Sequence, residues 1–285
     1  MLRWPWCEGA NTCRAAGSAG LVALTLAALP GAAAAQAGCS RELVVPVAPI
    51  GLSVTVTGED VAGVYPEVLR SSLAREGCPL KFSVVPRARQ ELMFETGRAD
   101  LLVPATRTPK RDESGVFVPM VSSRATVVSM INAERAPLRS LADLQARREI
   151  RVVLVRGFDY GEPYQALIKE LDQQGRLLLA VDAVSVARML GNGMAEATVM
   201  APSILVGAML GDARVRPLLE QLRYDPVDEL PWGESGVYVS KTALSEADRQ
   251  SLLALLERAA KSGQIWREFV KHYPPGSLTG SVRPR

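Results

Sequence analysis

Residues 97–111 read GRADLLVPATRTPKR, and this stretch decides the predicted fold class. Gly97 is expected to end a helix, and the mostly apolar residues 99–103 predict a short buried strand that ends at Pro104. A loop rich in hydroxyl and guanidinium groups follows, with Thr106, Arg107, Thr108, Lys110 and Arg111. In an open α/β sheet, ligands bind beyond the carboxyl ends of the strands. The stretch therefore predicts a site for a carboxylate or another anion at this edge of a sheet.

Strand and helix patterns alternate on both sides of this stretch. Ser140 and Ser245 each stand three residues before an Asp, a pattern that caps the start of a helix. Alternation with short connections is typical of a parallel, doubly wound α/β sheet. The predicted strands are 42–47, 80–85, 126–131, 150–155, 177–181, 197–200 and 236–240, and helices are expected around 65–73, 86–94, 163–174, 184–190 and 245–260.

The composition is that of a globular protein with a mixed-charge surface. The chain has 285 residues, 48% of them hydrophobic, and its mean hydropathy is +0.09. This is enough apolar material for one large domain or two of modest size. The net charge of +3 comes without a dense run of Lys and Arg, so nucleic acid is not an expected partner.

The first 37 residues have the pattern of a secretory signal peptide. Arg3 and Arg14 precede a run of small apolar residues from 15 to 35, and Ala-Gln-Ala at 35–37 supplies a cleavage pattern. Export is therefore predicted. A lipoprotein variant is the alternative, because residues 37–39 (Ala-Gly-Cys) resemble the end of a lipobox, although Gln stands before them where Leu is expected.

Cysteine usage agrees with export. Cleavage after residue 37 removes Cys7 and Cys13 and leaves Cys39 and Cys78. Two cysteines in an oxidising compartment commonly pair, and each of these precedes a strand that is expected to neighbour the other. A structural disulfide between Cys39 and Cys78 is predicted. Lipidation of Cys39 would instead leave Cys78 as a free thiol.

Four stretches follow one another in a fixed order: Gly97-Arg98-Ala99-Asp100 with Thr106, Thr108, Arg111, Phe117 and Pro119; residues 140–144 leading into 152–157; residues 190–197; and residues 236–241. In this order they resemble the family 3 periplasmic solute-binding proteins, the amino-acid-receptor type of ABC transporters. The resemblance implies an α/β, two-lobed periplasmic-binding-protein fold of type II, with two doubly wound sheets joined by two crossover strands. In this fold the ligand is enclosed by hinge bending.

The resemblance also implies how the chain divides. Residues 38–126 and 229–275 would form lobe 1, and residues 127–228 would form lobe 2, with crossovers at 126–131 and around 232–237. Residues 276–285 are rich in Pro, Gly and Ser and are expected to be a flexible tail.

The ligand site implied by the resemblance lies between the lobes. Arg111 matches the arginine that clamps the ligand carboxylate, since a planar guanidinium binds a carboxylate through two parallel hydrogen bonds. Thr106 matches a hydroxyl that shares this carboxylate. Replacement of Arg111 by Ala is expected to abolish binding with little loss of stability. Further expected ligand contacts are Ala105, Phe158, Asp159, Tyr160, Ser53, Trp232 and, of the two arginines at the start of a helix (Arg87 and Arg89), Arg89.

One position departs from the family's pattern. Ala201 stands where an acidic residue usually holds the ammonium group of the ligand. This weakens the expectation of an ordinary α-amino acid, unless Asp159 or Glu234 supplies the acid. The expected ligand is therefore a small carboxylate-bearing or amino-acid-like solute.

These features predict a periplasmic receptor that captures such a solute for an ABC-type membrane permease. The alternatives are a ligand-sensing receptor for a membrane signalling protein and a dehydratase-like enzyme that uses two carboxylates, such as Asp159 and Glu234. The sequence has no Gly-x-Ser-x-Gly motif, and its only histidine, His272, leaves no His-based triad and no His/Cys metal cluster. No catalytic residue, cofactor or metal is expected, and a monomer is predicted.

Overall fold

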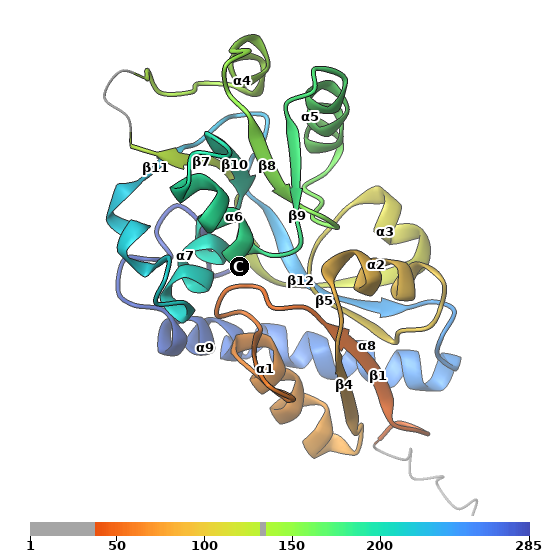
Figure 1. Ribbon diagram of the computed structural model, residues 1–285. Helices are drawn as coiled ribbons and strands as arrows, with labels where there is room; N and C mark the ends of the chain where they lie inside the picture. Colours follow the sequence, from red (N-terminus) through yellow and green to blue (C-terminus); the bar gives the residue numbers. More distant parts are fainter. Residues whose placement is uncertain (1–37, 132–134) are drawn as a thin grey trace, which may run out of the picture. The chain divides into compact units, whose positions relative to one another are not determined.

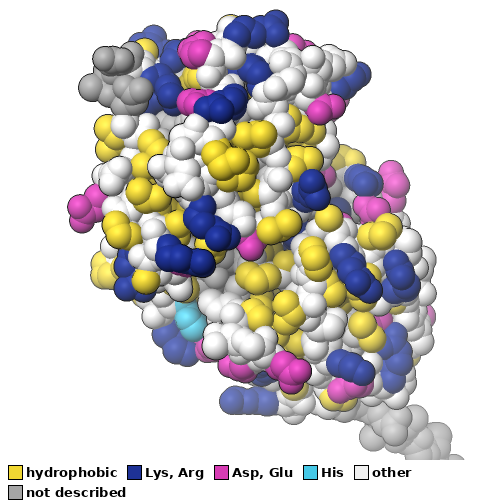
Figure 2. Space-filling view, viewed as in Figure 1, with side chains coloured by type: hydrophobic (Ala, Val, Ile, Leu, Met, Phe, Trp, Pro, Cys, Tyr) yellow, Lys and Arg dark blue, Asp and Glu magenta, His cyan; other side chains and the backbone are white. Residues whose placement is uncertain are grey.

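The computed structural model describes residues 38–131 and 135–285, and these residues pack as one unit (Figure 1). The predicted signal peptide, residues 1–37, lies outside the described residues. None of the helices within the two described ranges is long and apolar enough to cross a membrane. On the face shown in Figure 2, Lys and Arg side chains are interspersed with Asp and Glu, in keeping with the small net charge.

Two parallel strands begin the described chain. Strand β1 (Leu43–Val47) pairs with β4 (Leu80–Val84), and this order of strand, helix and strand was expected for the segment. Helix α1 (Val64–Ser72) turns its apolar face, which includes Tyr65 and Leu69, into the core. The elements between the strands are the hairpin β2 (Thr55–Thr57) and β3 (Asp60–Ala62), helix α1 (Val64–Ser72) and the 3-10 turn η1 (Ala74–Glu76).

A disulfide joins the segments that precede these two strands. Cys39 and Cys78 are bonded, and their Cα atoms lie 4.7 Å apart. Cys78 is fully buried, and the Cys39 N–H donates to the carbonyl of Gly77 (3.1 Å). The pairing predicted from the sequence is thus present in the structure.

A four-stranded antiparallel sheet adjoins this pair. The Asp100 N–H donates to the Val44 carbonyl (2.9 Å), which connects the start of β5 (Leu101–Thr106) to β1. Helices α8 (Glu246–Lys261) and α9 (Gln264–His272), from the end of the chain, pack beside α1 (Figure 1). The strand order is β13-β6-β12-β5, with β5 at Leu101–Thr106, β6 at Gly115–Ser123, β12 at Gly233–Ser240 and β13 at Val282–Arg283.

Contrary to the sequence-based expectation, Pro104 does not end its strand. Strand β5 continues to Thr106, and the register against β12 shifts at this point. Leu102 lies opposite Tyr238 and Ala105 opposite Gly236, so β5 carries one extra residue, a bulge where the missing N–H of proline is tolerated. Ala105 and Thr106 are therefore held by strand pairing rather than by a loop.

The segment after residue 275, which was expected to be a flexible tail, contacts the core through residues 278–283 in the structure, and its flexibility stays a prediction. Strand β13 pairs with β6, and Val282 lies opposite Ser123. Leu278 and Val282 are buried in the core, and Ser281 is fully buried. The Pro, Gly and Ser content favoured a loose segment, but two apolar side chains and the open edge of β6 are enough to dock it.

The middle of the chain forms a five-stranded sheet in the order β11-β7-β10-β8-β9. Strands β8, β9 and β10 are parallel, whereas β7 runs antiparallel to both of its neighbours, β10 and β11. The strands are β7 (Thr126–Met130), β8 (Val152–Val155), β9 (Leu177–Ala180), β10 (Ala197–Met200) and β11 (Leu222–Asp225). The helices are α4 (Leu141–Ala146), α5 (Glu162–Gln173), α6 (Ala183–Gly191), α7 (Pro202–Gly211) and η2 (Arg216–Gln221).

The buried side chains divide into two sets of clusters. One set draws on residues 43–121 and 237–282, and the other on residues 125–230. We call residues 38–123 and 233–285 lobe 1, and the described residues from 125 to 230 lobe 2. The domain boundaries predicted after residues 126 and 228 stay predictions.

Two short helices, α2 (Arg87–Glu95) and α3 (Pro109–Ser114), flank β5 in lobe 1. The Thr108 hydroxyl caps α3 by accepting from the Arg111 N–H (3.3 Å), and the Tyr238 hydroxyl accepts from the Thr108 N–H (3.1 Å). These contacts fix the turn that carries Arg111 beside the end of β5.

Candidate functional site

A cavity of about 60 Å³ lies between residues of the two lobes. Its walls are rich in hydroxyl groups and carry two arginines and one carboxylate. Polar or charged side chains in the lining are Ser53, Tyr65, Arg87, Thr106, Arg111, Ser123, Asp159, Tyr160, Ser203 and Ser235, and Ala105, Phe158 and Ala201 are among the apolar ones.

Arg111 lies on the lobe 1 side of the cavity and is 4% exposed. Its Nη1 donates to the carbonyl of Thr106 (2.8 Å), while Nε and Nη2 donate to the carboxylate of Glu91 (3.2 and 2.7 Å). A guanidinium has five N–H donors. Three of these donors have hydrogen-bond partners among the described residues, so Nη1 and Nη2 each keep one hydrogen for a further acceptor.

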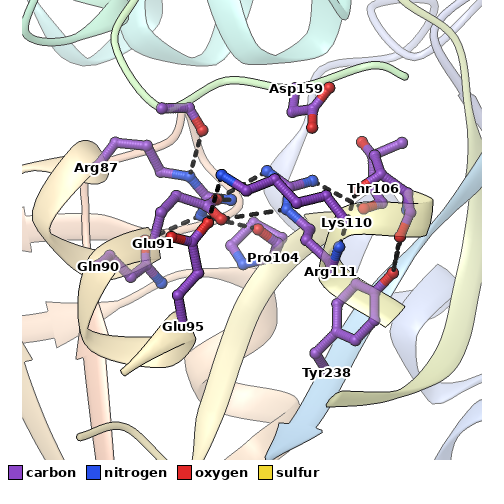
Figure 3. A network of polar contacts seen from close by, with 12 residues as sticks. Arg87, Gln90, Glu91, Glu95, Pro104, Thr106, Lys110, Arg111, Asp159 and Tyr238 are labelled. Atoms are coloured by element: carbon purple, nitrogen blue, oxygen red, sulfur yellow. Dashed lines mark hydrogen bonds and ion pairs between the residues drawn. The ribbon is translucent and has the colours of Figure 1, made fainter. Parts of the chain in front are cut away.

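Arg87, the first residue of α2, is the second buried guanidinium and is also 4% exposed. Its Nη1 donates to Gln90 Oε1 (2.9 Å) and to the Pro104 carbonyl (3.0 Å), and its Nη2 donates to Glu91 (2.5 Å). Burial lowers the pKa of Arg87; Glu91 opposes this shift and Arg111 adds to it. Figure 3 shows Glu91 between the two arginines.

The lobe 2 side of the cavity is the turn between β8 and α5. The Phe158 and Tyr160 rings meet edge to face, with centroids 6.2 Å apart. The Tyr160 hydroxyl accepts from the Ala201 N–H (3.3 Å), and burial raises the pKa of Tyr160 to about 12. Asp159 Oδ1 accepts from the Gly161 N–H (2.9 Å), and Figure 3 shows the Asp159 side chain directed toward Lys110 and Arg111.

Asp159 and Glu234, the two proposed substitutes for the acid missing at Ala201, differ in position. Asp159 lines the cavity, as does Ala201 itself. Glu234 is outside the lining and lies 3.8 Å from Arg107 in an exposed ion pair. Asp159 is therefore the acid placed to meet a cationic group, and the carboxylate pair considered for an enzyme is not gathered in this cavity.

Seven of the nine expected ligand contacts line the cavity: Arg111, Thr106, Ala105, Phe158, Asp159, Tyr160 and Ser53. Arg89 does not, because it is exposed two positions after Arg87, and two helical steps rotate a side chain by about 200°. Trp232 does not either, since its ring stacks on the Arg283 guanidinium, 4.2 Å from the ring centroid. Of the two arginines, Arg89 was the expected contact, whereas the structure places Arg87 in the cavity lining.

The lobes meet around the cavity through close backbone contacts. Gly207 in α7 lies against Gly51, so that a Cβ added to Gly207 would be 2.5 Å from the Leu52 nitrogen. Beside this contact, the Ser203 N–H donates to the hydroxyl of Ser281 (2.7 Å). The Ser203 carbonyl accepts from the hydroxyl of Tyr273 (3.2 Å). Small residues thus allow the lobes to touch on this side of the cavity.

No family model matches the chain, and no curated protein matches it in sequence. Solved structures do match. A histidine kinase sensor domain with similarity to periplasmic binding proteins has a TM-score of 0.63 at 20% identity, covering 86% of this chain and 98% of that one. The chain has the periplasmic-binding-protein fold.

Two further solved structures are similar to the same extent. EhuB in complex with hydroxyectoine has a TM-score of 0.65 at 16% identity, covering 84% of this chain and 91% of its own. The other is AbpA, an amino acid ABC transporter substrate-binding protein from Streptococcus pneumoniae Canada MDR_19A, bound to L-arginine. Its TM-score is 0.63 at 16% identity, and the match covers 81% of this chain and 94% of that one. At these identities the likeness establishes the fold and leaves the ligand to the chemistry of the cavity.

Proposed function

We propose that this protein is a periplasmic receptor that binds a small carboxylate-bearing or amino-acid-like solute between its lobes. The observation that carries the proposal is the pair of buried guanidiniums, Arg87 and Arg111, with a single carboxylate, Glu91, between them. Buried charges are usually paired, so the surplus of one positive charge on the lobe 1 side of the cavity favours an anionic ligand group there.

Arg111 supplies the carboxylate clamp. Its two remaining terminal hydrogens match the two oxygens of a carboxylate, and charge-assisted hydrogen bonds of this kind contribute about 1.5–3 kcal/mol each. The hydroxyls of Thr106 and Ser203 line the same cavity from opposite lobes. Asp159 offers a place for a cationic group, so a zwitterion is accommodated as well as a simple acid.

Ligand contacts to both lobes explain how binding becomes a signal. A solute that touches Arg111 in lobe 1 and the Phe158–Tyr160 turn in lobe 2 favours the closed arrangement over an open one. An ABC-type permease is the partner we propose. The likeness to a histidine kinase sensor domain supports a membrane sensor as the second candidate.

A thermal-shift screen tests the proposal. The panel contains α-amino acids, dicarboxylates, aromatic acids, zwitterionic solutes without an α-amino group, and sugars. A ligand that binds only the folded state raises the unfolding midpoint in a concentration-dependent way. We expect a carboxylate-bearing compound to do so, and a response to uncharged sugars alone would refute the proposed site.

A further inference from the structure

Glu91 holds the two cavity arginines together. Arg87 and Glu91 stand four positions apart on α2 and so share one face of the helix, while Arg111 reaches Glu91 from α3. Both Nη2 atoms donate to the same oxygen, Glu91 Oε1, at 2.5 Å from Arg87 and 2.7 Å from Arg111. The Glu91 side chain is only 14% exposed, so these contacts are little screened by water.

Glu91 also determines the net charge on the lobe 1 side of the cavity, where a ligand would bind. Two guanidiniums and one carboxylate leave a net charge of +1 on the lobe 1 side of the cavity. Nearby Lys110 does not change this sum, because its Nζ pairs with Glu95 Oε1 at 2.7 Å. Across the cavity, Asp159 adds one negative charge on lobe 2.

From this arrangement we infer that Glu91 is a positioning and specificity-determining residue, which limits the anionic group of the ligand to a single negative charge. The inference rests on the proposed anion site. A carboxylate neutralises the net charge of +1 that Arg87, Arg111 and Glu91 carry together. A doubly charged anion instead leaves one negative charge unpaired in a buried site that faces Asp159. The ligand class is therefore a monocarboxylate head group, and not a sulfate, a dianionic phosphate or a geminal dicarboxylate.

The test compares acetate and sulfate as probes at constant ionic strength. An NMR titration follows the Nε–Hε signals of Arg87 and Arg111, which report occupancy of this site and not a general salt effect. In the wild-type protein, acetate should bind more tightly than sulfate. Glu91→Gln raises the net charge of this group of three side chains from +1 to +2. The ratio of the sulfate affinity to the acetate affinity should then rise by about tenfold or more, and a tenfold change corresponds to only 1.4 kcal/mol.

Two further variants separate a local charge effect from general damage. Glu113→Gln removes a negative charge from an exposed position on α3, where no ion pair is formed among the described residues, and should leave the ratio unchanged. The double variant Arg87→Gln/Glu91→Gln removes one positive and one negative charge, so Arg111 leaves the net charge at +1. The affinity ratio should therefore return toward that of the wild type. An unchanged ratio in Glu91→Gln would overturn the inference.

A measurement on the wild-type chain keeps the inference testable if Glu91→Gln does not fold. Inorganic phosphate, titrated on both sides of its second pKa, should lose affinity as the dianion forms, and a gain would overturn the role of Glu91. If neither acetate nor phosphate perturbs the Arg111 signal in the wild type, the proposed anion site itself fails, and this inference with it.

Discussion

Replacement of Arg111 by Ala removes more than a ligand contact. The side chain is 4% exposed and makes three hydrogen bonds within the protein, two of them to Glu91 and one to the Thr106 carbonyl. Loss of one partner of a buried ion pair costs about 3–5 kcal/mol when the other charge is left alone. Here Glu91 keeps Arg87, so we expect a smaller loss of about 2–3 kcal/mol in the free energy of unfolding.

This value is larger than the expectation from sequence, in which Arg111→Ala leaves stability nearly intact. For a chain of this size, 1 kcal/mol corresponds to a shift of about 2–4 °C in the unfolding midpoint. We therefore expect the midpoint of Arg111→Ala to fall by roughly 4–12 °C, measured by calorimetry without added ligand.

Arg89→Ala is the matched control, because this exposed guanidinium lies on α2 outside the cavity lining. Its effect on unfolding should stay within about 0.5 kcal/mol. If Arg111→Ala costs no more than Arg89→Ala, the buried network around Glu91 does not contribute as described.

Three further predictions concern the disulfide, an acid-sensitive carboxylate and the lobe contact. Replacement of both Cys39 and Cys78 by Ala should lower the free energy of unfolding by about 4 kcal/mol, since the bond spans 39 positions, and an unchanged calorimetric midpoint would contradict a formed bridge. Hydrogen bonds from Ser40 lower the pKa of Asp248, so this carboxylate stabilises the fold above its unfolded-state pKa of about 3.9 and the gain is lost as the pH falls through the lower folded value. Asp248→Asn should thus destabilise the protein at pH 7 far more than at pH 2, and an equal loss at both, by urea unfolding, would count against this. Gly207→Ala places a Cβ 2.5 Å from the Leu52 nitrogen and should weaken binding and enlarge the radius of gyration in X-ray scattering, whereas Gly211→Ala on the same helix, with nothing within 4 Å, should do neither.

The fold could be predicted because its signals are local and ordered. Strand and helix periodicities and capping serines are visible in short windows, and the serines at 140 and 245 do cap α4 and α8. The tail could not be predicted in this way, because pairing of β13 with β6 depends on an open strand edge more than 150 positions away. Pro104 shows the same limit, since a bulge against β12 lets the strand continue.

Site residues were predictable where the backbone fixes them. Arg111 and Thr106 lie at the end of β5 and the start of α3, and both line the cavity. The choice between Arg87 and Arg89 depends on the phase of a helix whose first residue the sequence did not fix. Glu91 was missed because nothing in a sequence distinguishes a carboxylate that bridges two buried arginines from one on a solvated helix face.

One measurement tests the central claim, that Arg111 holds a ligand carboxylate, most directly. Isothermal titration compares the tightest-binding carboxylic acid from the solute panel with its primary amide, on the wild type and on Arg111→Ala. We expect the wild type to prefer the acid by at least about tenfold, and Arg111→Ala to bind acid and amide equally weakly. Equal affinity of the wild type for acid and amide would contradict the assignment of Arg111 as the carboxylate anchor.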